Sequence, residues 1–358
     1  MCARQVDDHS PIEIGRSCVG FGEPTWMVAE VSGNHGGSLE RAKTMLRAAA
    51  EAGADAVKIQ VYRPDTITLP SDKPDFRIDR QNAWASYRTM YELYESAHTP
   101  YEWLPELFEC ASVHGIDLFG SVFDDSAVDA LEQFDVAAYK VAAPEVCDLP
   151  LLRKIASTGK PVLLSTGVAT LEDIARAIDT LRSHGAGGIV LLKCSTAYPA
   201  PEDEVNLRTI PNMAETFGCP AGFSDHTIGT SIPIAAVSLG ADAIEKHIKL
   251  ADEDETVDSF FSLTIEEFGS MVKEVRRVER ALGKVEYRLT PSVQDNAKGR
   301  RSLYVSAPID KGGAFSRENI KSVRPGHGLA TAYYDIVLGR RAATDLEVGD
   351  RLSWEVIE

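Results

Sequence analysis

The sequence predicts an α/β protein built on a closed (β/α)₈ TIM barrel, followed by a small β-rich domain. Eight short apolar runs, each typical of a buried strand, alternate with helix-like segments over about 250 residues, which is the size and pattern of such a barrel. From Ser302 onward the pattern changes to short β runs separated by turns. We therefore expect a barrel domain at residues 1–285, a linker at 286–298 and a small domain at 299–358.

Composition indicates a globular enzyme of the cytoplasm. The chain has 358 residues and a formal net charge of −17, which argues against a nucleic-acid partner. It contains no apolar run long enough to span a membrane, and its first ten residues lack the pattern of a secretion signal. The six cysteines include no CxxC pair, so we expect reduced thiols and not a disulfide framework.

The eight expected strands are apolar runs that end at polar residues. They are Trp26–Val31, Ala56–Val61, Gly115–Val122, Ala137–Ala142, Pro161–Leu164, Gly188–Lys193, Pro220–Phe223 and Ala243–Ile248. The last two flank a helix-like run, Ile232–Leu239, and this strand–helix–strand order predicts parallel pairing.

Helix boundaries are marked by capping residues. Ser38 is expected to cap a helix that runs to about Ala52 and stops at Gly53. Threonines followed by acidic residues are expected to cap three further helices, the first of them through a capping box with proline at the first helical position. They begin at Thr99, Thr170 and Thr264, and the last of these helices ends near Gly283.

Polar residues recur at or near the carboxyl ends of the expected strands. They are Glu30, Lys58, Ser121, Lys140, Ser165, Thr196, Ser224, His226 and His247. In a barrel these ends meet at one mouth, where lysines, hydroxyls and helix N-termini would bind a phosphate, or a phosphate and a carboxylate. Taken singly, each has a plainer explanation as a capping hydroxyl or a lysine whose head reaches solvent.

The two histidines predict a metal site. His226 follows one strand and His247 ends the next, so both imidazoles emerge at the same end of the sheet. Neighbouring imidazoles suit Mn, Fe, Co or Zn. The alternative is that each is a separate hydrogen-bonded histidine.

Two further features allow two interpretations each. In the long connection from Arg63 to Thr99, the aromatic residues Trp84, Tyr87, Tyr91 and Tyr94 lie near helical spacing. A packed helix face is favoured over an aromatic ligand box. The loop at Arg324 could present a guanidinium to a substrate or be a plain surface turn.

Several motifs resemble the sialic acid synthase family. They are the run from Glu30 to Gly37, the strand with Lys140, Ser165-Thr166-Gly167, Cys194 to Pro201, Phe223-Ser224-Asp225-His226-Thr227, and Ile244 to His247. The segment Arg324-Pro325-Gly326-His327-Gly328 resembles that family's antifreeze-like (SAF) domain. The resemblance implies condensation of phosphoenolpyruvate with an open-chain hexosamine aldehyde. The products would be a nine-carbon 2-keto-3-deoxy sugar acid and phosphate, and the cofactor Mn²⁺ or Mg²⁺.

The resemblance also implies roles for individual residues. His226 and His247 would bind the metal, and Glu145 would lie near the metal-bound water. The phosphoenolpyruvate site would comprise Lys58, Lys140, Ser165 and Ser224, with Ser121 where relatives usually have threonine. The sugar would contact Glu30, Tyr198, Asp258 and, from the partner chain of a domain-swapped homodimer, Arg324. We group Glu30, Lys58, Lys140 and Glu145 as the catalytic residues, and Thr196 with the substrate-binding residues.

Other details are more similar to the pseudaminic acid branch of the family than to the N-acetylneuraminate branch. Examples are Arg63 to Leu69, Tyr198-Pro199-Ala200-Pro201 and Asn206 to Pro211. One departure is Ala143, where a relative would often place a serine of the phosphoenolpyruvate site. Two alternatives remain open: the same condensation on a different aldose, or a non-catalytic barrel that binds a sugar acid or phosphate.

Overall fold

The computed structural model describes residues 11–252 and 254–358. The chain divides into two compact units, residues 1–283 and residues 284–358. Residues 1–10, on which the expectation about a secretion signal rests, lie outside the described residues, as does Cys2. The described cysteines that are free thiols are Cys18, Cys110, Cys147, Cys194 and Cys219.

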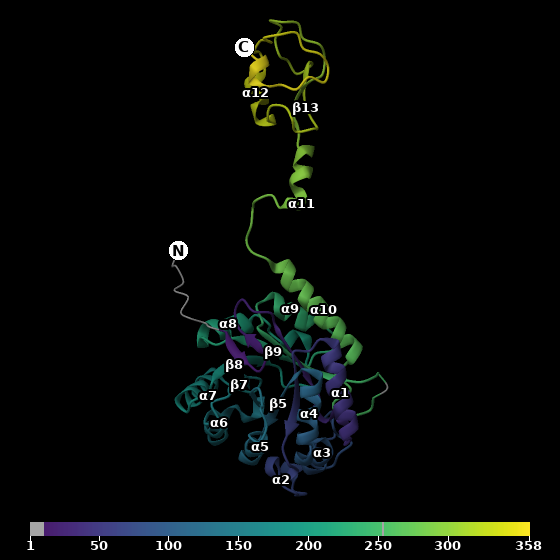
Figure 1. The fold of residues 1–358 in the computed structure, drawn as a ribbon, viewed down its shortest axis with the longest axis vertical. Helices are drawn as coiled ribbons and strands as arrows, with labels where there is room; N and C mark the ends of the chain where they lie inside the picture. The colour runs from purple at the N-terminus through teal and green to yellow at the C-terminus, as the bar shows by residue number, and fades with distance from the viewer. Residues whose placement is uncertain (1–10, 253) are drawn as a thin grey trace. The chain divides into compact units, whose positions relative to one another are not determined.

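The first unit is a closed parallel barrel (Figure 1). Its strands are β3 (Trp26–Glu30), β4 (Ala56–Val61), β5 (Asp117–Val122), β6 (Tyr139–Val141), β7 (Pro161–Ser165), β8 (Gly188–Cys194), β9 (Ala221–Asp225) and β10 (Ala243–Lys249). β10 pairs in parallel with both β9 and β3, which closes the ring and confirms the predicted barrel. The short strand β11 (Leu263–Thr264) pairs in parallel with the carboxyl end of β10. A hairpin of β1 (Ile12–Ile14) and β2 (Ser17–Val19), too short to show a period in the sequence, precedes the barrel.

Helices connect the strands and lie outside the ring (Figure 1). They are α1 (Leu39–Ala52), α2 (Pro64–Ile67), α3 (Met90–Ala97), α4 (Leu104–His114), α5 (Asp125–Leu131), α6 (Leu149–Ala156), α7 (Leu171–Ser183), α8 (Thr209–Phe217), α9 (Ser231–Ser238) and α10 (Ile265–Leu282). Short 3₁₀ turns are η1 (Ser32–His35), η2 (Pro74–Phe76), η3 (Tyr101–Trp103), η4 (Ala143–Cys147) and η5 (Glu202–Glu204).

Most of the expected helix boundaries are present because their caps form. Ser38 accepts the Arg41 amide at the start of α1, and Gly53 ends that helix with a φ of 91°, a conformation that favours glycine. Thr170 and Thr264 each complete a capping box at the start of α7 and α10.

The capping box expected at Thr99 does not form. Pro100 occupies the N-cap position of η3 and makes no side-chain cap, and α4 begins only at Leu104. The Thr99 amide instead donates to the Gln60 carbonyl at 3.3 Å, which ties this residue to the end of β4. A tertiary contact therefore overrides the local capping signal.

The second unit has a small apolar core of its own. Its elements are α11 (Pro291–Gln294), η6 (Asp295–Gly299), β12 (Ser302–Val305), β13 (Ile320–Val323), η7 (Thr331–Tyr333), α12 (Tyr334–Val337) and η8 (Trp354–Val356). The antiparallel pair β12–β13 buries Leu303 and Ile320 against Phe315 and Leu352. The segment expected to be a linker, 286–298, contains α11 and most of η6. None of the described helices combines the length and the apolar character needed to cross a bilayer.

Candidate active site

A cavity of about 480 Å³ lies at the carboxyl ends of the barrel strands. Every barrel residue predicted for the site lines it, with the exception of Glu30. The lining includes Lys58, Ser121, Lys140, Glu145, Ser165, Thr196, Tyr198, Ser224, His226, His247 and Asp258. The parallel register brings these residues together, since it places the ends of successive strands at one face of the barrel.

Two buried lysines, each beside a serine hydroxyl, form one part of the cavity wall. The Lys58 ammonium donates to Ser121 Oγ at 3.0 Å, and the Lys140 ammonium donates to Ser165 Oγ at 2.7 Å. Lys58 also pairs with Glu245 Oε1 at 3.0 Å. A buried ammonium group is stable only with such partners, or with a bound anion.

The charges in this wall do not cancel. Burial lowers the pKa of Lys140, whereas for Lys58 burial is outweighed by Glu245 and Glu30, which raise its pKa. Burial would raise the pKa of Glu245, but Lys140 and Lys58 hold it at about 2. Burial raises the pKa of Glu30 to about 7, against the opposing effect of Lys58. Near neutral pH Glu245 is ionised and Glu30 only partly so beside the two lysines, and an anionic ligand would relieve the burial that lowers the pKa of Lys140.

Glu30 lies behind the cavity wall and not in it. Its side chain is fully buried; Oε1 accepts from Gln60 Nε2 at 3.0 Å, and Oε2 lies 3.3 Å from Lys58 Nζ. The expectation that Glu30 contacts the sugar does not match this position. The carboxylate instead supports Lys58 and Gln60, both of which line the cavity.

The two predicted metal ligands lie side by side. The ring centroids of His226 and His247 are 5.2 Å apart. His226 Nδ1 donates to the Ser195 carbonyl at 3.1 Å, and His247 Nδ1 lies 3.2 Å from Ser32 Oγ. With Nδ1 engaged, Nε2 of each ring is left for a ligand, which is the usual arrangement at metal-binding histidines.

The pKa shifts of these two rings have opposite directions, and only the shift of His247 favours a bound cation. Burial, together with His226 and Lys58, lowers the pKa of His247 well below its usual value, so this ring is neutral. For His226 the hydrogen bond with Cys194 outweighs burial and raises the pKa. Within the described part of the chain, no group of three or more His, Cys, Asp and Glu side chains is arranged to hold a metal ion. Among the described residues, His226 and His247 thus form a pair and are not part of a larger cluster of such side chains.

Glu145, on η4, is half-buried, and its buried Oε2 atom has no hydrogen-bond partner among the described residues. Burial raises its pKa from 4.5 to about 7. A carboxyl that titrates near neutral pH and lines a cavity can accept a proton from a bound molecule.

This raised pKa predicts a stability change with pH. Folded protein binds the Glu145 proton more tightly than the unfolded chain does, so ionisation lowers the free energy of unfolding as pH rises from about 4.5 to about 7. We expect the decrease to be smaller in Glu145→Gln. Urea unfolding across this range measures it, with the surface variant Glu109→Gln as the control for a lost charge. If the free energy of unfolding of Glu145→Gln fell with pH as steeply as that of the wild type, the raised pKa could not belong to Glu145.

The other part of the cavity wall is aromatic. Trp84 Nε1 donates to the Val257 carbonyl at 2.9 Å, and the indole lies 5.1 Å from the Tyr198 ring. Trp84 precedes helix α3, so the favoured interpretation of a packed helix face is wrong for this residue. Trp84 and Tyr94 both line the cavity, as the alternative of an aromatic ligand box required.

The residues predicted for the site omit several that line the cavity, among them Gln60 and Glu245. The signal was present, because side chains two apart on a strand share a face. Gln60 follows Lys58 by two on β4, and Glu245 precedes His247 by two on β10.

A close approach of two loops sets the position of Thr196. A Cβ on Gly167 would lie 2.1 Å from Thr196 Oγ1, so the turn after Ser165 requires glycine at this position. Ala143, the departure noted in the sequence, is buried in the cavity wall and adds no hydroxyl there. Arg324 lies on the exposed surface of the second unit, directly after β13.

Comparisons with known proteins identify relatives of this chain in both sequence and structure. The sequence model of the NeuB family matches residues 45–287, and that of the SAF domain matches residues 300–358. The chain is 45% identical to pseudaminic acid synthase from Campylobacter jejuni, covering 91% of this chain and 95% of that protein. It is 41% identical to pseudaminic acid synthase from Helicobacter pylori, covering 94% and 98%. Among solved structures, N-acetylneuraminic acid (sialic acid) synthetase from Leptospira borgpetersenii, crystallised with citrate, has a TM-score of 0.71 and 28% identity. That match covers 80% of this chain and 94% of the other.

Proposed function

Because the chain belongs to the NeuB family and ends in a SAF domain, we propose that it is a nonulosonate synthase. It condenses phosphoenolpyruvate with the open-chain aldehyde of an amino sugar. The products are a nine-carbon 2-keto-3-deoxy sugar acid and inorganic phosphate. The relatives named pseudaminic acid synthase, at 41% and 45% identity, favour a pseudaminic acid-type product.

The observation that carries this proposal is the pair of buried lysine–serine contacts, Lys58–Ser121 and Lys140–Ser165. Phosphoenolpyruvate has a phosphate and a carboxylate on adjacent positions, and each needs a cationic partner when it leaves water. A single buried lysine would leave one of these anions without a partner. The cavity supplies two, with hydroxyls that can rotate to donate.

The chemistry uses the enol carbon as nucleophile. The electron pair of the C2–C3 double bond attacks the aldehyde carbon, and the aldehyde oxygen gains a proton. Water then adds at C2 of phosphoenolpyruvate and loses one proton, which balances the proton gained by the aldehyde oxygen. The resulting C2 hydroxyl gives its proton to the departing phosphate as the C2–O bond to phosphate breaks, which leaves the ketone. Lys58 and Lys140 hold the anionic end in place, which aligns C3 with the aldehyde. Glu145, with a pKa of about 7, is our candidate to accept the proton from the attacking water.

We also propose that His226 and His247 hold a divalent cation, Mn²⁺ or Mg²⁺. Support comes from their engaged Nδ1 atoms and from the low pKa of His247. Such a cation, when bound, supplies Lewis-acid polarisation of the aldehyde oxygen.

A phosphate-release assay tests the function against its alternatives. Phosphoenolpyruvate, Mn²⁺ or Mg²⁺ and a panel of hexosamines and other aldoses are supplied, and inorganic phosphate is measured. Release that depends on an amino sugar supports the proposal. Phosphate release that occurs only with an aldose other than an amino sugar would support the alternative of a different acceptor. If no aldose caused phosphate release, the alternative of a non-catalytic barrel would be supported.

The SAF domain leads to a prediction about assembly. We propose a domain-swapped homodimer in which Arg324 serves the sugar site of the other chain, as the family resemblance implies. Arg324→Ala and His247→Ala chains are each expected to be inactive. Mixing them should restore activity, because one site of a mixed dimer has both an intact barrel and an intact arginine. Mixed dimers, verified by differential tags, that show no recovery would refute the swap.

A further inference from the structure

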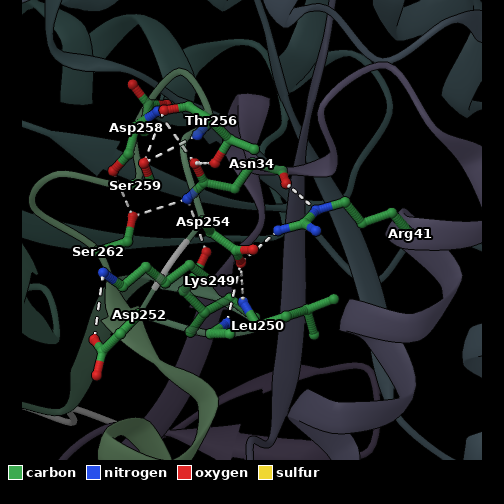
Figure 2. A network of polar contacts seen from close by, with 12 residues as sticks. Asn34, Arg41, Lys249, Leu250, Asp252, Asp254, Thr256, Asp258, Ser259 and Ser262 are labelled. Atoms are coloured by element: carbon green, nitrogen blue, oxygen red, sulfur yellow. Dashed lines mark hydrogen bonds and ion pairs between the residues drawn. The ribbon is translucent and has the colours of Figure 1, made fainter.

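Asn34, on η1 directly after β3, makes four hydrogen bonds through one buried carboxamide (Figure 2). Nδ2 donates to the Ile248 carbonyl and to Ser262 Oγ, both at 2.8 Å. Oδ1 accepts from Thr256 Oγ1 at 2.7 Å and from the Asp258 amide at 3.1 Å. A carbonyl can only accept and an amide N–H can only donate, so these partners fix the orientation of the group.

These partners lie on the segment of residues 254–262, apart from Ile248 at the end of β10. This segment supplies one side of the cavity mouth. Asp258 lines the cavity, and the Val257 carbonyl fixes the indole of Trp84. The ring of Phe261 lies 4.7 Å from that of His247 and 5.8 Å from that of His226, between centroids. The position of the segment therefore determines the shape of the acceptor end of the site.

Two further contacts attach the segment to the same turn and to α1. Arg41 Nε donates to the Asn34 carbonyl at 2.9 Å, and its guanidinium pairs with Asp254 (Figure 2). A Cβ on Gly33 would lie 3.0 Å from Val257 Cβ, so the segment packs directly on the backbone of η1. Asp258 also bonds with Ser32, the Gly33 backbone and Trp84. Residues 254–262 form no helix or strand, so contacts of this kind hold the segment.

We propose that Asn34 is a positioning residue, which holds the 254–262 segment so that Asp258 faces the sugar acceptor. The inference rests on the function proposed above. The phosphoenolpyruvate end of the cavity does not depend on these bonds, because Lys58 and Lys140 are held by Glu245, Ser121 and Ser165. Loss of the carboxamide should therefore weaken binding of the amino sugar and leave binding of phosphoenolpyruvate unchanged. A general loss of stability would affect both substrates.

The main variant is Asn34→Ala. Its matched control is Thr25→Val, which removes a buried hydrogen bond to the Ala241 carbonyl; Thr25 directly precedes β3, whereas Asn34 lies beyond the other end of that strand. In Asn34→Ala we expect the KM for the amino sugar to rise about tenfold or more, while the KM for phosphoenolpyruvate stays within about twofold. In Thr25→Val both constants should remain at their normal values.

A second readout does not require activity. Hydrogen–deuterium exchange of the peptide covering 254–262 should be faster in Asn34→Ala than in the wild type, while exchange in β5 is unchanged. A wild-type protein without synthase activity would refute the proposed function, and exchange would still test the anchor. Normal exchange in this peptide, or KM values that rise equally for both substrates, would overturn the positioning role.

Thr256→Val covers the case in which Asn34→Ala does not fold. This change preserves side-chain shape at a half-buried position and removes only the hydrogen bond to Asn34 Oδ1. We expect a KM rise of about threefold for the amino sugar and faster exchange of the segment. If both variants fold, the double variant should be no worse than Asn34→Ala, because the two changes remove a shared bond. Unchanged KM and unchanged exchange in Thr256→Val would overturn the proposal.

Discussion

His247→Ala is expected to lower turnover by roughly a thousandfold or more while leaving the barrel folded, as loss of a Lewis-acid cation removes several kcal/mol of transition-state stabilisation. The fold should survive because the ring lies at the cavity and not among the apolar side chains between strands and helices. His247 Nδ1 contacts Ser32 Oγ, which lies on η1 and is not part of the apolar core cluster. Steady-state phosphate release measures the loss of turnover, and circular dichroism shows whether the barrel remains folded.

A direct measurement of Mn²⁺ binding distinguishes loss of the metal site from a general loss of activity in His247→Ala. Titration calorimetry with Mn²⁺ should show binding to the wild type and none to His247→Ala. His184→Ala, a histidine at the end of α7, is the control and should bind normally. Wild-type activity in excess chelator, or normal Mn²⁺ binding by His247→Ala, would contradict the assignment.

Lys140→Met is expected to raise the KM for phosphoenolpyruvate roughly ten- to a hundredfold, which is the value of a hydrogen bond to a charged group. Methionine retains the length of the side chain and removes the ammonium group. Glu245 keeps its partner Lys58 at 3.0 Å, so the change leaves no buried carboxylate without a cation. Binding of phosphoenolpyruvate alone, measured by calorimetry, should weaken by a similar factor.

Lys193→Met provides the matched control. Lys193 lies on the neighbouring strand β8, where its ammonium donates to the Cys194 carbonyl at 2.8 Å, and it does not line the cavity. This variant should bind phosphoenolpyruvate normally. If Lys140→Met also bound it normally, the anion site would have to lie elsewhere.

The sequence was sufficient to predict the barrel and most of its site, because these features depend on local pattern. Alternation of apolar runs with capped helices identified the strands, and parallel register then placed Lys58, Lys140 and the two histidines at one face. Lys58 and His247 could also have identified Gln60 and Glu245 by the two-residue period.

Features that depend on long-range contacts could not be predicted in this way. Thr99 has the sequence of a cap but is tied to Gln60 on another element. Trp84 lies near helical spacing but belongs to the connection before α3, where it bonds to Val257, far along the chain. Asn34 resembles any residue of a turn, and its role becomes visible only when β10 and the 254–262 segment fold around it.

The central claim is that phosphoenolpyruvate and an amino sugar are joined through a new carbon–carbon bond. The most direct measurement supplies phosphoenolpyruvate labelled with ¹³C at all three carbons, a hexosamine acceptor and Mn²⁺, and determines the product by mass spectrometry and NMR. The account predicts a nine-carbon keto acid with three adjacent labelled carbons, of which the former C3 of phosphoenolpyruvate is bonded to the former C1 of the sugar. One phosphate should be released for each molecule of keto acid formed. Labelled pyruvate without any labelled nine-carbon product, or phosphate release at the same rate without the sugar, would contradict it.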